Sequence, residues 1–464
     1  MSIASLAICA ILQASPIAVT VDPEVELLSL VARFAGFREY AMPNSKSPYA
    51  TAIEEHFAAL RDHAAVQHLK RLRSANGVGY DAIASLAVHL GPLPELEEVV
   101  PFDLDPTPFG GRLDARWGGA KAREFLVLLR DFAAKGEAAA FFAGQSERFA
   151  AIEARFAERL AESRARPWFD TFFGERQGAT CRAIPGLLCG GGNYGVGVRH
   201  PGGKPEELTP IFGCWSWDSA GLPVFGEGYL PLFVHELCHS YTNPVVDRYS
   251  AVLVPIGERL FRARAKAMQA QAYGNGRTVM YETFVRAMVV CCRAETEGAA
   301  AAELQAQQEV QAHFTWVPRV AALLRARAGA KEAPAEFDAL VPTIAAALAD
   351  EADLLASEAA AAPKLVRSSP EDGARELPAG AAELVLTFDR PMKADSWSFT
   401  GAAADLPKII GAPRYDDARK TLTVAVELEP SRTYRIGLNS ARHRGFQSAD
   451  GVALEPLTLT IHTR

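Results

Sequence analysis

The chain has 464 residues, of which 49% are hydrophobic and 22% are charged, and its formal net charge is −7. This length exceeds one ordinary domain and suits two or three, each with a substantial core. The negative balance and the lack of a Lys/Arg block disfavour nucleic acid as a partner.

The first 20 residues are predicted to be a signal peptide. An apolar stretch, Ile3–Leu12, is followed by Gln-Ala-Ser-Pro at 13–16, which is typical of a processing site, although no basic residue precedes Arg33. We therefore expect the mature protein to be secreted or periplasmic. A misplaced start or a buried first strand is the alternative. No other apolar run reaches 18 residues, so no integral membrane span is expected after signal removal.

Residues 21–362 are predicted to form one mostly helical domain with a small sheet. Apolar residues recur at helical spacing in five segments of its first half. The expected helices begin at Glu24 and then cover Tyr49–Leu72, Asp81–Leu90, Ala120–Ala133 and Gly144–Ala165. Between Thr180 and Gly228, glycine, proline and aromatic residues replace the alanine-rich texture. This segment predicts two short strands, at Asn193–Val198 and Ile211–Trp217.

Two cysteines of this segment have two interpretations. Cys181 and Cys189 bracket a short loop and could form a disulfide in an oxidising compartment. Two buried thiols are the alternative.

Residues 235–239 read His-Glu-Leu-Cys-His and carry most of the functional information in the chain. On an α-helix, positions i and i+4 share a face, so His235 and His239 can bind the same metal ion. Glu236 would then lie close enough to act as a general base. Pro231 suits the first turn of such a helix, and a proline at 244 predicts that the helix ends near Thr242. A chance match to the motif is the alternative.

A tetrahedral zinc site with an open position needs a third protein ligand. Val245 stands six residues past His239, where some zinc proteins have a third histidine, and it cannot bind a metal. Glu282 lies in another predicted helix and is the favoured third ligand. Asp247 and Glu258 are the competitors.

Residues 363–464 are predicted to form an all-β sandwich. Pro363 marks the change of architecture, and turn sequences separate the β-forming runs that follow. The expected strands include Leu384–Phe388, Leu422–Val426, Tyr434–Leu438 and Leu457–Ile461. The predicted fold class of the whole chain is therefore α+β.

Residues 233–244, with Glu282 and then Arg286-Ala287 downstream, resemble a family of exported bacterial proteins of unknown function. The pentapeptide with a downstream glutamate is also similar to the gluzincin type of zincin metallopeptidase. The resemblance runs from about Val21 to Leu348, and the segment from Lys364 onwards resembles a bacterial Ig-like domain. Gluzincins often carry an aspartate one turn after the ligand glutamate, whereas Arg286 occupies that position here.

These observations predict a zinc-dependent metallopeptidase that acts on a peptide or protein substrate. His235, His239 and Glu282 would bind Zn²⁺, and Glu236 would be the general base. A zinc-binding adhesion or cell-wall-binding protein without activity is one alternative, and a zinc hydrolase of a non-peptide amide is another. The Ig-like domain is expected to bind a protein or a cell-wall surface.

Two further roles are predicted around the metal. The strand Asn193–Val198 would receive substrate as an added strand at the sheet edge, with a plain structural hairpin as the alternative. Tyr273, His200 and Tyr194 are candidates for stabilising the oxyanion of the transition state.

Overall fold

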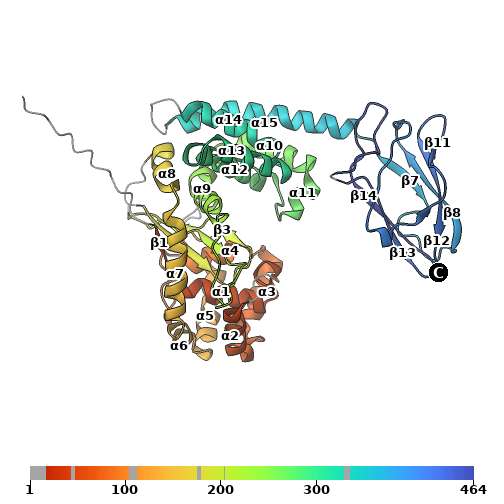
Figure 1. Ribbon diagram of the computed structural model, residues 1–464. Helices are drawn as coiled ribbons and strands as arrows, with labels where there is room; N and C mark the ends of the chain where they lie inside the picture. The colour runs from red at the N-terminus through yellow and green to blue at the C-terminus, as the bar shows by residue number, and fades with distance from the viewer. Residues whose placement is uncertain are drawn as a thin grey trace, which may run out of the picture. The chain divides into compact units, whose positions relative to one another are not determined.

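The computed structural model describes most of the chain as two compact units that divide between Ala349 and Asp350. The described residues are 17–42, 47–103, 112–174, 179–202, 204–328, 335–440 and 442–464. The first unit is mostly helical with one small sheet, and the second is all β, so the predicted α+β class is confirmed (Figure 1). The division falls inside helix α15, Ala335–Ala361, ahead of the predicted boundary at 362/363.

The described residues of the first half of the first unit form eight α-helices. They are α1 Pro23–Phe34, α2 Pro48–His56, α3 Ala64–Asn76, α4 Asp81–Val88, α5 Gly119–Lys135, α6 Ala138–Ala143, α7 Ser146–Ala161 and α8 Ala165–Phe173. Asp22 begins the set as the N-cap of α1, because its carboxylate accepts hydrogen bonds from the backbone N–H groups of Glu24 and Val25.

The single long helix predicted over Tyr49–Leu72 is wrong. A 3₁₀ turn, Ala58–Leu60, separates α2 from α3. His63 then starts α3 as its N-cap, because its ring Nδ1 accepts the backbone N–H of Ala65 at 3.2 Å. Apolar spacing cannot show this break, since a side chain that caps a new helix leaves the hydrophobic pattern unchanged.

The first unit also contains a small sheet, and the segment predicted to be its edge lies at its edge. Its strands are β1 Ala18–Val19, β2 Thr180–Gly186, β3 Asn193–Tyr194, β4 Gly197–Val198, β5 Glu207–Leu208 and β6 Ile211–Gly213. β5 and β6 pair with successive parts of β2 in one parallel register, and β4 and β3 pair in turn with β5 and β6. Asn193–Val198 is therefore an edge of the sheet, as predicted.

β1 lies within the segment predicted to be a signal peptide. Ala18 pairs with Arg182 and Val19 with Ala183, and Thr20 donates its N–H to the carbonyl of Ala183. The folded part of the unit thus begins before residue 21, and residues 1–16 of the predicted signal peptide lie outside the described residues.

A second group of helices completes the first unit. They are α9 Tyr229–Arg248, α10 Ser250–Ala263, α11 Ala265–Ala270, α12 Gly276–Thr296, α13 Ala299–Gln311 and α14 Val317–Ala328. Helix α12 is central, since it packs against α9, α10, α13 and α14. Figure 1 shows α9 between the small sheet on one side and the remaining helices of this group on the other.

The predicted end of α9 near Thr242 is wrong, because the helix continues through Pro244 to Arg248. An internal proline costs about 3 kcal/mol, since it removes one backbone hydrogen bond and crowds the preceding turn. Burial of the next turn offsets this cost. Val246 is fully buried, and the Tyr281 hydroxyl lies 2.6 and 2.7 Å from the two carboxylate oxygens of Asp247.

Helices α10 and α12 meet through two glycines. A Cβ atom built on Gly257 would lie 2.3 Å from the carbonyl oxygen of Gly276, and one built on Gly276 would lie 2.1 Å from the backbone nitrogen of Glu258. The Glu258 carboxylate accepts the Gly276 N–H at 2.7 Å. The start of α12 is therefore fixed against α10 by direct backbone contact.

The second unit is a sandwich of two antiparallel sheets, and all four of its predicted strands are present. The strands are β7 Leu365–Ser369, β8 Gly380–Phe388, β9 Phe399–Thr400, β10 Lys408–Ile409, β11 Arg414–Tyr415, β12 Thr421–Leu428, β13 Thr433–Leu438 and β14 Leu457–His462. One sheet has the order β10-β12-β8-β7 with β11 beside β12, and the other is β14-β13-β9. Alternate residues such as Leu384, Leu386 and Phe388 form the core. Across the described part of the chain, every helix is too short or too polar to cross a membrane.

Two buried carboxyls of α1 link the helices to the loops around them. Glu24 accepts the N–H of Leu93 at 2.9 Å, and Glu26 accepts the N–H of Leu187 at 2.7 Å. Burial, as the largest cause, raises the pKa of each carboxyl from 4.5 to about 8. Both groups therefore hold a proton at neutral pH in the folded protein.

We expect the stability of the first unit to fall between pH 5 and pH 8. Unfolded glutamates ionise near pH 4.5, whereas folded Glu24 and Glu26 ionise near pH 8, so the free energy of unfolding declines by up to about 1.4 kcal/mol per pH unit for each group. Glu26→Gln should remove about half of this slope in urea denaturation followed by helical circular dichroism. Exposed Glu55→Gln is the control, and equal slopes in all three proteins would contradict the prediction.

We also expect Gly276→Ala to destabilise the fold. Alanine favours a helix over glycine by about 1 kcal/mol, but its Cβ would collide with backbone of α10, and overpacking of this kind costs about 1–3 kcal/mol. Denaturation of Gly226→Ala serves as the matched control, because no atom lies within 4 Å of a Cβ there. Equal stability of the two variants would contradict the prediction, because it would mean that α10 and α12 move apart at no cost to accept the added Cβ.

Candidate metal centre

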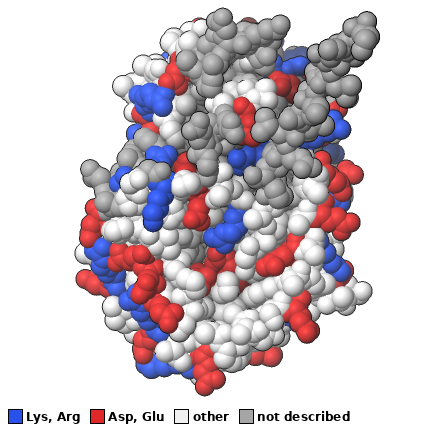
Figure 2. Space-filling view, turned by 90° about the vertical axis from the view of Figure 1, so that its left-hand side faces the viewer, with Lys and Arg blue, Asp and Glu red and all other residues white. Residues whose placement is uncertain are grey.

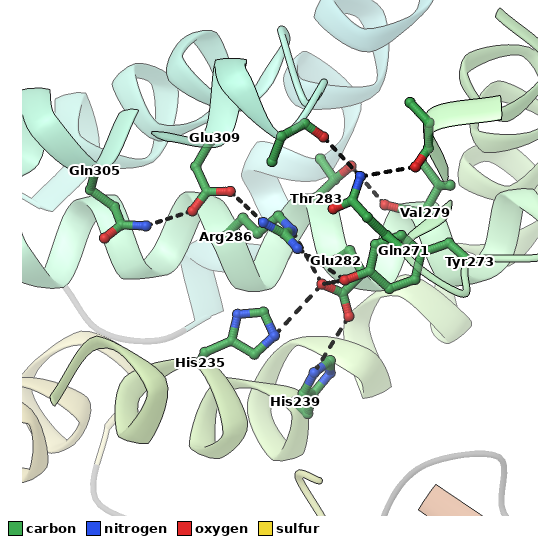
Figure 3. Close-up of polar contacts among 12 residues, drawn as sticks. His235, His239, Gln271, Tyr273, Val279, Glu282, Thr283, Arg286, Gln305 and Glu309 are labelled. Carbon is green, nitrogen blue, oxygen red and sulfur yellow. Dashed lines mark hydrogen bonds and ion pairs between the residues drawn. The ribbon is translucent and has the colours of Figure 1, made fainter. Parts of the chain in front are cut away.

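Three side chains from two helices meet at one point. His235 and His239 lie one turn apart on α9, and Glu282 faces them from α12 (Figure 3). The His235 Nε2 atom is 3.6 Å from Glu282 Oε2, and the His239 Nε2 atom is 3.7 Å from Glu282 Oε1. Metal–ligand distances of about 2.0–2.1 Å imply about 3.4 Å between the ligands of a tetrahedral zinc site. The observed spacing fits such a site.

The His235 ring is neutral and the His239 ring has a side-chain partner that can orient it. Burial, as the largest cause, lowers the pKa of His235 from 6.5 to about 3, so this ring is neutral at neutral pH. The His239 Nδ1 atom lies 3.3 Å from the Asn243 side-chain oxygen. Donation of the Nδ1–H to this oxygen leaves the lone pair on Nε2 directed at Glu282. Asn243, which precedes Pro244 on the same helix, thus orients a predicted ligand.

Arg286 orients the Glu282 carboxylate. Its Nε–H donates to Glu282 Oε2 at 3.2 Å, and the Tyr273 hydroxyl donates to the same oxygen at 3.0 Å. On the other side, Arg286 Nη1 donates at 2.5 Å to Glu309, which also accepts the Gln305 amide at 2.6 Å (Figure 3). Arg286 stands where gluzincins often carry an aspartate, and here it fixes the orientation of the Glu282 carboxylate.

The same contacts set the charge of Glu282. Burial would raise the pKa of this carboxyl, but His235, Arg286 and His239 outweigh burial and lower its pKa below the ordinary value of 4.5. Glu282 is therefore a carboxylate at neutral pH, as a metal ligand must be.

Glu236 lies against the edge strand of the sheet. Its carboxyl is buried and accepts a hydrogen bond from the backbone of Gly195. Burial first, and then the neighbouring Glu282, raise the pKa of Glu236 well above 4.5. A Cβ on Gly195 would lie 2.3 Å from the Glu236 carbonyl oxygen and 2.8 Å from the His239 Cβ. Glycine at 195 therefore allows the strand to lie directly against α9.

These residues line a large open cleft. Its volume is about 1580 Å³, and its walls include the three predicted ligands, Glu236 and the edge strand segment Asn193–Gly197. Of the three predicted oxyanion donors, Tyr273 lines the cleft but donates to Glu282, and Tyr194 is buried and stacks on Tyr40. His200 lies outside the cleft lining and hydrogen-bonds Glu207 at 2.9 Å.

The competing third ligands have other partners. Asp247 binds Tyr281 and Arg277, and Glu258 accepts the N–H of Gly276. Among the described residues, His235, His239 and Glu282 form the one cluster with the geometry of a metal site. Cys181 and Cys189 are free, buried thiols in the structure, which matches the second interpretation of this pair.

Charges of both signs are mixed on the face in Figure 2. Lys and Arg side chains lie among Asp and Glu side chains rather than apart from them. The described residues of this face therefore form no continuous basic surface of the kind that binds nucleic acid.

We expect Arg286→Lys to weaken metal binding. A lysine ammonium cannot donate to Glu282, Glu309 and Tyr273 together, and loss of such orienting contacts typically costs about 10- to 100-fold in metal affinity. Competition with a chromophoric zinc chelator measures the affinity. Arg277→Lys is the matched control, because Arg277 lies on the same helix and pairs with Asp247 instead. Equal affinities of the two variants would contradict the orienting role.

Residues 359–454 match the model of a bacterial Ig-like domain. No curated protein sequence matches the chain. Two structures of a surface-layer protein show a weak likeness. The S-layer protein rSbsC is 17% identical over 48% of this chain, with a TM-score of 0.17. Domains 1-6 of SbsC are 16% identical over 50% of this chain, with a TM-score of 0.18.

The matches cover 33% of each of those surface-layer chains, so this chain spans about a third of their length. A likeness this weak supports no conclusion about fold or function. Residues 17–327, more than half of the chain, match a family model described as "Domain of unknown function (DUF4932)". The protein therefore belongs to this family, and a bacterial Ig-like domain follows the family domain.

Proposed function

We propose that the protein is a zinc-dependent peptidase of the zincin type. The observation that carries this proposal is the convergence of two imidazole nitrogens and one carboxylate at 3.6 and 3.7 Å, with Glu236 beside them in an open cleft. Two histidines and one glutamate are a ligand set of catalytic zinc, which leaves a fourth position for water or substrate. The neutral His235 and the ionised Glu282 have the charges that this metal requires.

The chain's own residues supply the proton transfers. A zinc ion held by His235, His239 and Glu282 would acidify a water, polarise the substrate carbonyl and favour the ionised form of the nearby Glu236. Glu236 takes a proton from the attacking water and later delivers it to the leaving amine. The Glu236 carboxyl holds the proton between these two steps.

A polypeptide is the substrate class that best fits the cleft. Among the described residues, no strand pairs with the outer side of the edge strand Asn193–Val198, and its residues 193–197 line the cleft together with the predicted metal ligands. An extended peptide can pair with such an edge through backbone hydrogen bonds, independently of its side chains. The glycines at 195 and 197 bring this backbone close to α9 and to the neighbouring strand.

We further propose that the protein acts outside the cytoplasm, as a secreted or periplasmic enzyme. The apolar segment Ile3–Leu12 and the processing-type sequence after it support export. In this proposal the Ig-like unit binds a protein or a cell-wall surface and holds the peptidase near its substrate.

We expect Glu236→Gln to abolish peptide hydrolysis and to keep the metal. Glutamine preserves the size of the side chain but cannot accept the proton, so the rate should fall by at least about 10²–10⁴-fold. The assay measures hydrolysis of a peptide mixture by mass spectrometry together with zinc content by elemental analysis. Glu227→Gln, an exposed glutamate in the wall of the same cleft, is the control and should keep full activity.

The two readouts separate the possible outcomes. One zinc per chain with peptide cleavage by the wild type and loss in Glu236→Gln supports the proposal. Zinc without cleavage of any peptide would instead indicate a structural metal site or a substrate with a non-peptide amide bond. Full activity in Glu236→Gln would exclude the proposed proton transfer.

A further inference from the structure

Tyr80 has a backbone conformation that normally requires glycine. Its φ and ψ angles are 51° and −127°, in the turn that leads into α4. The N–H of Ala82 donates to the carbonyl of Gly79 at 3.0 Å across this turn. These values match the second position of a type II′ turn, which glycine dominates because a Cβ atom is strained there. A large aromatic residue at this position therefore lowers stability.

Buried neighbours hold Tyr80 in this strained conformation. Its N–H donates to Glu39 Oε1 at 3.2 Å, and its carbonyl accepts the Tyr40 hydroxyl at 2.9 Å. Glu39 and Tyr40 are 4% and 1% exposed, and Glu39 is itself paired with Arg73. Both contacts are to backbone atoms of residue 80, so Glu39 and Tyr40 can hold this backbone conformation without the tyrosine side chain.

The Tyr80 side chain itself is exposed in the wall of the catalytic cleft. It is 42% exposed and lines the same cleft as His235 and Glu236. Tyr40, whose hydroxyl donates to the Tyr80 carbonyl, also stacks on Tyr194 of the edge strand, so the turn lies beside that strand. The residue is therefore only partly buried, although its position strains the backbone.

The charged groups beside the ring neutralise one another. Arg116 donates to Asp81 at 2.6 Å and to Asp114 at 2.8 Å, and all three residues lie in the same wall of the cleft. Arg73 lies 5.5 Å from the centre of the Tyr80 ring and is paired with Glu39. These charged groups are thus paired with one another, and the exposed Tyr80 ring lies beside them in the cleft lining.

We infer that Tyr80 is a specificity-determining residue, whose ring packs against an apolar or aromatic side chain of the polypeptide substrate. Strained residues persist where the side chain they present is useful, and an aromatic ring gains most from contact with another apolar group. The inference rests on the proposed peptidase function, because it names one substrate preference of that cleft.

Three variants separate the ring from the backbone. Tyr80→Gly removes both the ring and the strain, Tyr80→Ala removes the ring but keeps the strain, and Tyr80→Phe keeps both. The substrate is a mixture of randomised, fluorescence-quenched octapeptides, and mass spectrometry records the side chains around each cleavage site. Individual peptides with the preferred residue or with alanine in its place then give kcat/KM.

We expect the wild type and Tyr80→Phe to prefer an apolar or aromatic residue at one substrate position. Tyr80→Gly and Tyr80→Ala should lose about 10-fold or more in kcat/KM on the preferred peptide and little on the alanine peptide. Zinc content should stay the same in all four proteins. Tyr80→Gly should melt about 2–4 °C above Tyr80→Ala, because only glycine relieves the strain.

Two results would overturn the inference and leave the peptidase function intact. One is an unchanged preference in both ring-deleted variants. The other is an equal loss on both peptides with a lower melting temperature in both variants, which would make the ring a structural element. Failure of the wild type to cleave any peptide would reject the peptidase function itself, and this inference with it.

Discussion

The site depends on the buried Glu282 carboxylate, which lies between one arginine and two imidazoles. Glu282 is 6% exposed, and an unpaired carboxylate at such depth would be too costly for the fold to retain. Arg286 and Tyr273 bind one of its oxygens, so both oxygens keep fixed positions relative to His235 and His239. Helix α12 must therefore pack on α9 in one register for the cluster to form.

The neighbouring helices stabilise that register. Glu309 of α13 accepts a hydrogen bond from Arg286 and another from Gln305, and the glycine contact with α10 fixes the start of α12. Tyr281 of α12 reaches Asp247, two turns past His239 on α9. This network fixes α9 and α12 to each other at several points. The side chains proposed to bind the metal are therefore already in place, and binding needs no costly rearrangement.

The local parts of this structure could be predicted from the sequence, and the parts set by packing could not. His235 and His239 share a face through helical periodicity alone. The change to glycine, proline and aromatic residues indicated the edge strand, and β-forming runs between turn sequences indicated the four strands of the sandwich. The helix through Pro244 could not be predicted, because burial of the following turn outweighs the local effect of proline. Likewise, spacing suggested Glu282, but no pattern showed that Arg286 would orient it.

Zinc absorption spectroscopy, or anomalous diffraction at the zinc edge, tests the central claim most directly. The account predicts one zinc ion between α9 and α12, with two imidazole nitrogens and carboxylate oxygen at about 2.0–2.2 Å, from His235, His239 and Glu282. A zinc ion bound elsewhere, sulfur ligands from the cysteines, or no bound metal in protein purified with zinc present would contradict it.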